Sequence, residues 1–340
     1  MKSTALLVIA LSLALPCLAL AQTTSPETSP STRAAESAPA LTAPGAAPST
    51  QPSSDSRKGF ISAWQAPLLT LSGIGILVLA VWSIRRILHP DKLLMHDAPN
   101  RPNSLTPLHL LAAMLVYALA GSAVKAYHEY VLDVAEPGSI VKLLSVAGVQ
   151  VLMILTALGL GAIGFRFGLR NGMGLNLRHW MMDLGRAILG LLAVMPVVMG
   201  LSMLMDYLVP AEHKKTNEML TILKDLPLAW RYVVIFSAVV LAPVWEELFF
   251  RGLLQSMLRR YLGGPWLAIL VASIVFAALH VSFTPEGKIA FQDVLPLLAL
   301  SLALGYNYER CGRLLPSILI HSLFNALMII TFMGGDGLFS

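Results

Sequence analysis

The stretch APVWEELFFRGLL, residues 242–254, places two adjacent glutamates and an arginine inside an apolar run that extends over Tyr232–Leu254. A helical run of about 20 apolar residues is long enough to cross a hydrocarbon core of about 30 Å. Charged groups are costly at that depth, so those that occur there are candidates for function. This stretch therefore predicts a membrane helix that carries a polar site.

Seven further apolar runs surround it, at Ala66–Ile84, Leu108–Val124, Ile140–Phe165, Ile188–Leu208, Trp266–Phe283, Val294–Tyr308 and Leu314–Phe332. Hydrophobic residues make up 56% of the chain and charged residues 13%, and the mean hydropathy is +0.70. A soluble domain carries roughly 25% charged residues to wet its surface. The sequence therefore predicts an all-α fold, a polytopic membrane helix bundle of about eight transmembrane helices, and excludes a soluble enzyme, a coiled coil and a disordered regulator.

The net charge of +5 comes from Lys and Arg residues in short loops beside the apolar runs. This is the positive-inside bias of membrane proteins, and no basic domain for nucleic acid is formed. Arg85, Arg86 and the pairs Arg259/Arg260 and Arg310/Arg313 mark alternate connections as cytoplasmic. We expect a multi-pass protein of a bacterial inner (plasma) membrane, with the lipid bilayer as its surroundings and no nucleic-acid partner.

The first 58 residues have two different compositions. Residues 1–21 have a positive start at Lys2, an apolar stretch and the small-residue site Ala19-Leu20-Ala21, as in a cleaved signal peptide; a retained helix is the alternative. Residues 22–58 are rich in Ser, Thr, Pro and Ala and predict a disordered linker. We divide the rest into N-terminal transmembrane helices, residues 59–184, and a core, residues 185–340.

Few ionisable groups lie deep in the apolar runs. Glu247 and Arg251 are four residues apart, which places them on one helix face and allows an ion pair, whereas Glu246 points about 100° away. Glu246 stands 17 residues before Gly263 and His280 stands 17 after it. In an antiparallel helix pair these two side chains lie at the same depth. His321 and Asn325 are again four residues apart on the last run and predict a third contribution to one site.

The order EExxxR at 246–251, FxxxH at 276–280 and HxxxN at 321–325 resembles the CAAX-processing and bacteriocin-processing family of intramembrane proteases, also called abortive-infection-like. The resemblance covers roughly residues 185–332. It implies an intramembrane endopeptidase that hydrolyses a peptide bond near the cytoplasmic membrane face with a glutamate-activated water. The implied substrate is a membrane-associated peptide or protein.

The resemblance also implies residue roles. Glu246 would be the general base, His280 would hold the water or its metal, and Glu247 with Arg251 would be an orienting pair. His321 and Asn325 would stabilise the oxyanion. The family is commonly described as metalloproteases, which implies zinc on His280 and His321. A metal-free mechanism stays open, because catalytic zinc usually takes three protein ligands and using Glu246 as the third would remove the base.

Two other functions fit the same groups. A proton-coupled membrane transporter also uses buried Glu and His side chains, although no internal repeat is visible. A non-catalytic membrane scaffold of the same fold would keep the helices without the reaction. A serine intramembrane protease would need an embedded GxSG, which the sequence lacks.

Overall fold

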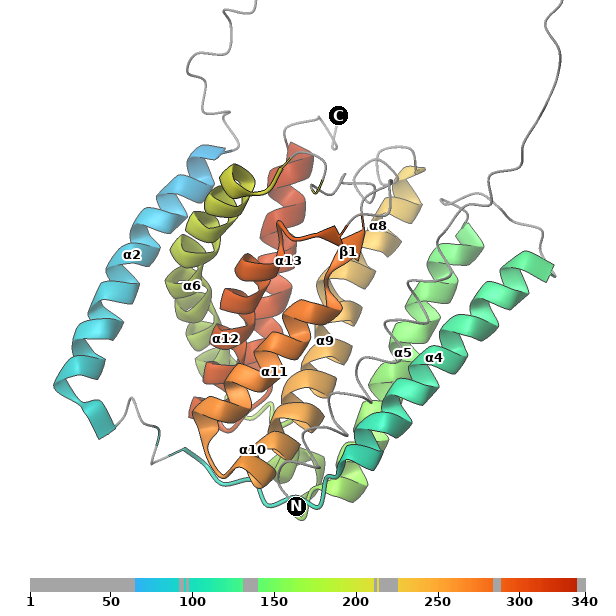
Figure 1. The fold of residues 1–340 in the computed structure, drawn as a ribbon, viewed down its shortest axis with the longest axis horizontal. Coiled ribbons are helices and arrows are strands. Elements are labelled where there is room, and N and C mark those ends of the chain that lie inside the picture. Colours follow the sequence, from blue (N-terminus) through green and yellow to red (C-terminus); the bar gives the residue numbers. More distant parts are fainter. Residues whose placement is uncertain are drawn as a thin grey trace, which may run out of the picture.

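The computed structural model describes residues 65–91, 95, 98–130, 140–210, 213, 226–283 and 289–334. The expected signal peptide, residues 1–21, and the linker, residues 22–58, lie outside the described residues. The described part is a bundle of helices that run roughly side by side (Figure 1). The predicted all-α, polytopic membrane bundle is thereby confirmed.

The elements follow one another in chain order as α2 (Gln65–Leu88), α4 (Pro107–Tyr130), α5 (Ile140–Gly164), η2 (Gly168–Met173), α6 (Trp180–Leu208), α8 (Leu228–Phe236), η4 (Ser237–Leu241), α9 (Ala242–Glu247), η5 (Leu248–Gln255), α10 (Ser256–Leu262), α11 (Pro265–Leu279), β1 (Ser282–Phe283), β2 (Ile289–Ala290), α12 (Val294–Cys311) and α13 (Leu315–Gly334). The three η elements are π-helical, and β1 pairs with β2 in a short antiparallel hairpin.

Each of the eight expected apolar runs coincides with a helix. Five helices of the described part are long and apolar enough to cross a membrane, and they span Leu68–Leu88, Pro107–Tyr130, Ile140–Gly164, Trp180–Leu208 and Leu228–Leu262. Pro265–Leu279 and Leu315–Thr331 are apolar but shorter. The end expected for the sixth run was wrong: α11 stops at Leu279, because His280 leaves the helical conformation and the chain turns into β1.

The long helix from Leu228 to Leu262 changes its winding twice. It is π-helical at η4, just before Pro243, and again over the eight residues of η5. Proline has no N–H to donate and so disturbs the hydrogen bonds of the preceding turn. Short π-helical segments occur often at functional sites, and here they flank the two glutamates of α9.

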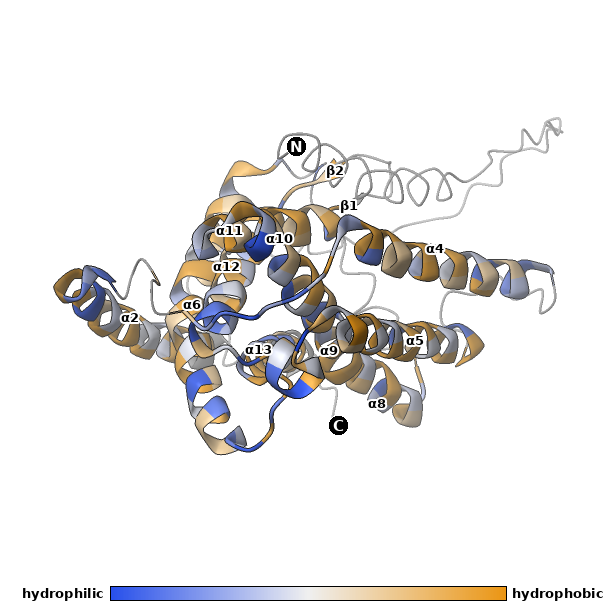
Figure 2. Ribbon diagram, turned by 90° about the horizontal axis from the view of Figure 1, so that it is seen from below, coloured by the Kyte–Doolittle hydropathy of each residue, from blue (hydrophilic) through white to orange (hydrophobic). Residues whose placement is uncertain are grey.

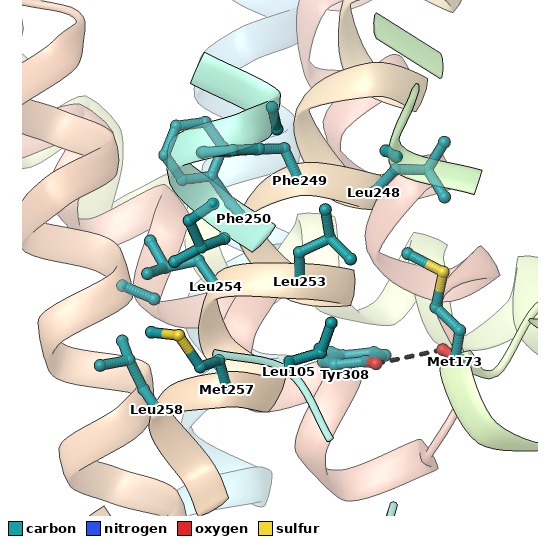
Figure 3. Packing of buried hydrophobic residues seen from close by; sticks show 14 of the residues in the cluster. Leu105, Met173, Leu248, Phe249, Phe250, Leu253, Leu254, Met257, Leu258 and Tyr308 are labelled. Atoms are coloured by element: carbon teal, nitrogen blue, oxygen red, sulfur yellow. Dashed lines mark hydrogen bonds between the residues drawn. The ribbon is translucent and has the colours of Figure 1, made fainter. Parts of the chain in front are cut away.

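The main core lies around η5. All eight residues of η5 are buried, and its apolar side chains pack with Leu105, Met173 and Tyr308 from three other segments (Figure 3). The Tyr308 hydroxyl donates to the Met173 backbone oxygen over 3.1 Å. A Cβ at Gly252 would overlap the flexible end of the Met173 side chain, which would then have to move. The glutamate-bearing helix is therefore held on all sides.

The outer helices present apolar side chains to their surroundings. In Figure 1, α2 stands at one edge of the bundle against α6, and α4 and α5 form the other edge. Orange, apolar residues cover most of these outer helices in Figure 2, and blue residues gather near helix ends. Leu77, Ile87, Leu108 and Ile163 are each more than two-thirds exposed. Such a surface suits contact with lipid.

Candidate active site

Five of the six predicted site residues meet at the centre of the bundle. α9 supplies Glu246 and Glu247, and η5 supplies Arg251 one turn later. His280 caps the C-terminal end of α11, and His321 lies on α13. The Glu246 Oε2 atom is 3.6 Å from His280 Nε2 and 3.8 Å from His321 Nε2.

Glu247 accepts hydrogen bonds from two other residues in the buried part of the site. Its Oε1 accepts from Arg251 Nη1 over 2.8 Å and from His321 Nδ1 over 3.0 Å. The Glu247 and Arg251 side chains are 0% and 1% exposed. The i, i+4 ion pair expected from the sequence is therefore present, and it holds the His321 ring as well.

Phe276 packs against both imidazoles and the arginine of the site. Its ring centroid lies 4.2 Å from that of His280 and 5.8 Å from that of His321. The Arg251 guanidinium carbon lies 4.9 Å from the same centroid. Because Phe276 is fully buried, it fixes the planes of both imidazoles and covers the arginine.

The hydrogen bonds determine which imidazole nitrogens carry protons. His280 Nδ1 lies 2.7 Å from the Phe276 carbonyl oxygen, which can only accept, so Nδ1 carries the hydrogen. His321 Nδ1 carries a hydrogen for the same reason, because its partner Glu247 Oε1 already accepts from Arg251. In a neutral ring, Nε2 is then an acceptor. Both Nε2 atoms thus turn a lone pair toward the Glu246 carboxylate.

This arrangement brings three acceptors together with no donor between them. Glu246 Oε2 is buried and has no hydrogen-bond partner among the described residues, and the same holds for Glu247 Oε2. Buried carboxylate oxygens are normally satisfied. A molecule that donates hydrogen bonds, or an added proton, therefore suits the space between Glu246 and the two imidazoles.

Asn325 makes a different contact from the one expected. Its Nδ2 donates to the Ala238 backbone oxygen over 2.9 Å. In η4 the Ala242 N–H bonds to the Ser237 oxygen, five residues back, so residue 243 would bond to Ala238 in the same pattern. Pro243 has no N–H, and the Asn325 amide takes its place. This amide therefore stabilises the turn that precedes the two glutamates.

The side chains around Glu246 can be compared with the ligands that the expected zinc would need. Within the described ranges, no three or more His, Cys, Asp or Glu side chains are arranged as a metal-ion site. His280 and His321 supply two imidazoles, one fewer than the usual number of protein ligands of catalytic zinc.

Sequence reasoning missed one partner of the site. Ser301 on α12 accepts from Arg251 Nη2 at its Oγ over 2.8 Å. A serine in the apolar run of α12 gives no signal of this contact, because serine is tolerated in membrane helices wherever its hydroxyl can bond to a backbone oxygen.

Comparison with known proteins bears on the same helices. Residues 228–327 match the family model described as type II CAAX prenyl endopeptidase Rce1-like. Among curated proteins, UPF0177 protein YaiF of Lactococcus lactis subsp. lactis (strain IL1403) is 32% identical over 120 residues, which is 35% of this chain and 49% of that protein. UPF0177 protein YbdI of the same strain is 28% identical over 119 residues, 35% of this chain and 57% of that protein.

The matches cover only part of each protein. The chain spans about half the length of the curated relatives it matches. No solved structure matches the chain. The matched segment nevertheless runs from the start of α8 into α13 and contains all seven residues of the three motifs. The resemblance to the CAAX-processing endopeptidase family, which the motifs indicate, is thus confirmed for the helices that carry the site.

Proposed function

We propose that the chain is an intramembrane endopeptidase in which Glu246 activates a water molecule to hydrolyse a peptide bond. One observation carries the proposal: the buried Glu246 Oε2 lacks a donor and faces two imidazole nitrogens 3.6 and 3.8 Å away. These separations exceed a direct hydrogen bond and suit one bridging water. The match to an endopeptidase family supports the same reading.

The first step is attack on the carbonyl carbon. Water donates one hydrogen to Glu246 Oε2 and is oriented by the His280 Nε2 lone pair, which can accept the other. As the new C–O bond forms, Glu246 takes the proton, and the carbonyl oxygen becomes an oxyanion. His280 is 30% exposed and Glu246 12%, so the reacting bond would approach from the His280 side.

The oxyanion needs hydrogen-bond donors. His321, held in place by Glu247, is one side chain that we propose for this role. It donates from Nε2 only when its ring carries a second proton. The Asn325 amide donates one hydrogen to the Ala238 backbone oxygen. Its second amide hydrogen is the donor that we propose for the oxyanion.

The second step breaks the C–N bond. The protonated Glu246 returns its proton to the leaving amine nitrogen, and the carboxylic acid product is released. The site therefore ends in its starting protonation state. A membrane-associated peptide or protein is the proposed substrate class, because the site lies within apolar helices.

The test is cleavage of a quenched-fluorescent peptide library by detergent-solubilised protein. Glu246→Gln keeps the shape of the side chain but cannot take the proton, so kcat should fall by ~10²–10⁴-fold. Glu129→Gln, an exposed glutamate on α4, is the matched control and should not change kcat. Wild-type turnover in Glu246→Gln would show that Glu246 is not the base, whereas no cleavage by the wild-type protein would favour a proton-coupled transporter.

A further inference from the structure

Polar side chains continue from the site toward the arginine-bearing end of the bundle. They recur every fourth residue on two facing helices, and together with the Gly305 backbone oxygen we call them the polar ladder: Glu247, Arg251, Gln255 and Arg259 on one helix, and Ser301, Gly305 and Glu309 on α12. The mechanism above uses only the first two of these residues.

Direct hydrogen bonds connect the η5 residues of the polar ladder to those of α12. Arg251 Nη2 donates to Ser301 Oγ over 2.8 Å and to the Ser301 backbone oxygen over 3.2 Å. Gln255 Nε2 donates to the Gly305 backbone oxygen and to Glu309 Oε1, each over 3.0 Å. Gly305 leaves room for this rung, since a Cβ there would lie 2.7 Å from Gln255 Oε1.

The far end of the polar ladder is tied to the segment between α2 and α4. Arg101 Nη2 lies 2.8 Å from Glu309 Oε1, and Arg259 Nε lies 3.8 Å from Glu309 Oε2. Arg101 also donates to the Tyr308 backbone oxygen over 3.0 Å and lies 3.8 Å from the centre of its ring. Arg101 is 7% exposed and Glu309 is 0% exposed. A second buried ion pair therefore closes the ladder.

We propose that Ser301, Gln255, Glu309 and Arg101 are positioning residues for the proposed hydrolysis, and this inference rests on the proposed function. Arg251 donates from Nη1 to Glu247 and from Nη2 to Ser301. Because Ser301 belongs to α12, this helix fixes the position of the guanidinium. Glu247 in turn orients His321 through the same oxygen that Arg251 holds. Arg101, Glu309 and Gln255 hold α12 against η5. Ser301 on the same α12 helix then holds Arg251, which shares the Glu247 oxygen that orients His321.

The first experiment compares two buried serines. Ser301→Ala removes the hydroxyl that holds Arg251, and we expect kcat to fall by about 10- to 100-fold with KM unchanged, as a misplaced catalytic group does. Ser317→Ala is the matched control, because its hydroxyl donates to the Leu304 backbone oxygen over 2.9 Å and not to Arg251. Equal kcat values in the two variants, or an effect on KM alone, would overturn the proposal.

A second variant decides the question if Ser301→Ala does not fold. Gly305→Ala favours the helix but pushes the Gln255 side chain away from its two acceptors, so kcat should fall. Gly200→Ala in α6 is the control, because nothing lies within 4 Å of its new Cβ. A Gly305→Ala variant with wild-type kcat would contradict a positioning role.

A third readout does not depend on peptide cleavage. Diethylpyrocarbonate modifies imidazole nitrogens, and mass spectrometry follows His321 and the exposed His179 separately. Ser301→Ala should speed modification of His321 several-fold and leave His179 unchanged, whereas equal His321 rates in Ser301→Ala and Ser317→Ala would refute the ladder. If wild-type protein cleaves no peptide, the proposed function fails while this comparison still tests the ladder.

Discussion

Replacement of Asn325 by alanine tests whether its amide substitutes for the N–H that Pro243 lacks. The change removes the donor to the Ala238 oxygen, a bond of 2.9 Å, and leaves that carbonyl without its partner in an apolar region. An unsatisfied buried acceptor costs about 1–3 kcal/mol of unfolding free energy, and this partly buried carbonyl corresponds to the lower half of that range. Asn325→Ala should therefore be destabilised by that amount, whatever its catalytic role.

Asn307→Ala is the matched control. Asn307 Nδ2 also donates over 2.9 Å to a helical carbonyl, that of Ala303. The regular α12 helix gives that oxygen the backbone N–H of residue 307 as well, so the carbonyl stays satisfied. The expected loss of stability is within about 0.5 kcal/mol.

A double-mutant cycle makes the test specific. Pro243→Ala supplies a backbone N–H at the position where η4 needs one, so in that background Asn325→Ala should cost about 1–2 kcal/mol less than in the wild type. Denaturant unfolding in mild detergent, followed by tryptophan fluorescence, measures all four proteins. A coupling energy near zero, or equal losses for Asn325→Ala and Asn307→Ala, would refute the assignment of this amide to the backbone.

Three other predictions use the same stability and cleavage assays. Glu247→Gln leaves Arg251 unpaired and should cost about 3–5 kcal/mol, and the Glu247→Gln/Arg251→Gln double variant should recover part of it; no recovery would show that the lone charge is not the cause. Chelator-treated protein should cleave at the untreated rate, and one equivalent of zinc that is lost when either imidazole is replaced would contradict this. Gly174→Ala and Gly168→Ala both place an alanine at positive φ (+89° and +63°), at roughly 1–2 kcal/mol each. Gly174→Ala should cost more, because its Cβ would lie 2.6 Å from the Gly312 oxygen.

The helical periodicity of the sequence predicts most of the site because the spacing rules of helices hold there. Four-residue spacing predicts the Glu247–Arg251 pair, and equal distances from Gly263 predict that Glu246 and His280 meet. Both arguments need only a rise per residue and an antiparallel turn. The eight apolar runs likewise coincide with helices, because apolar length is the strongest signal in a membrane protein.

The parts that could not be predicted depend on backbone detail. The sequence shows Pro243 but not that the chain before it becomes π-helical, and so the partner of Asn325 was unforeseen. The end of α11 at Leu279 depends on a turn that apolarity does not report. Ser301 and Glu309 pair with residues some 50 positions away, and no local spacing predicts such contacts.

The early end of α11 bears on where the water for hydrolysis comes from. Fifteen helical residues span about 22 Å, less than a hydrocarbon core of about 30 Å. The backbone beyond Leu279 is therefore non-helical at membrane depth, and such backbone is tolerated only inside protein or beside a water-filled space. His280 stands at that point with nearly a third of its side chain exposed. The interruption that ends the helix therefore lies on the side from which water would have to reach the proposed reaction, which consumes one water per bond.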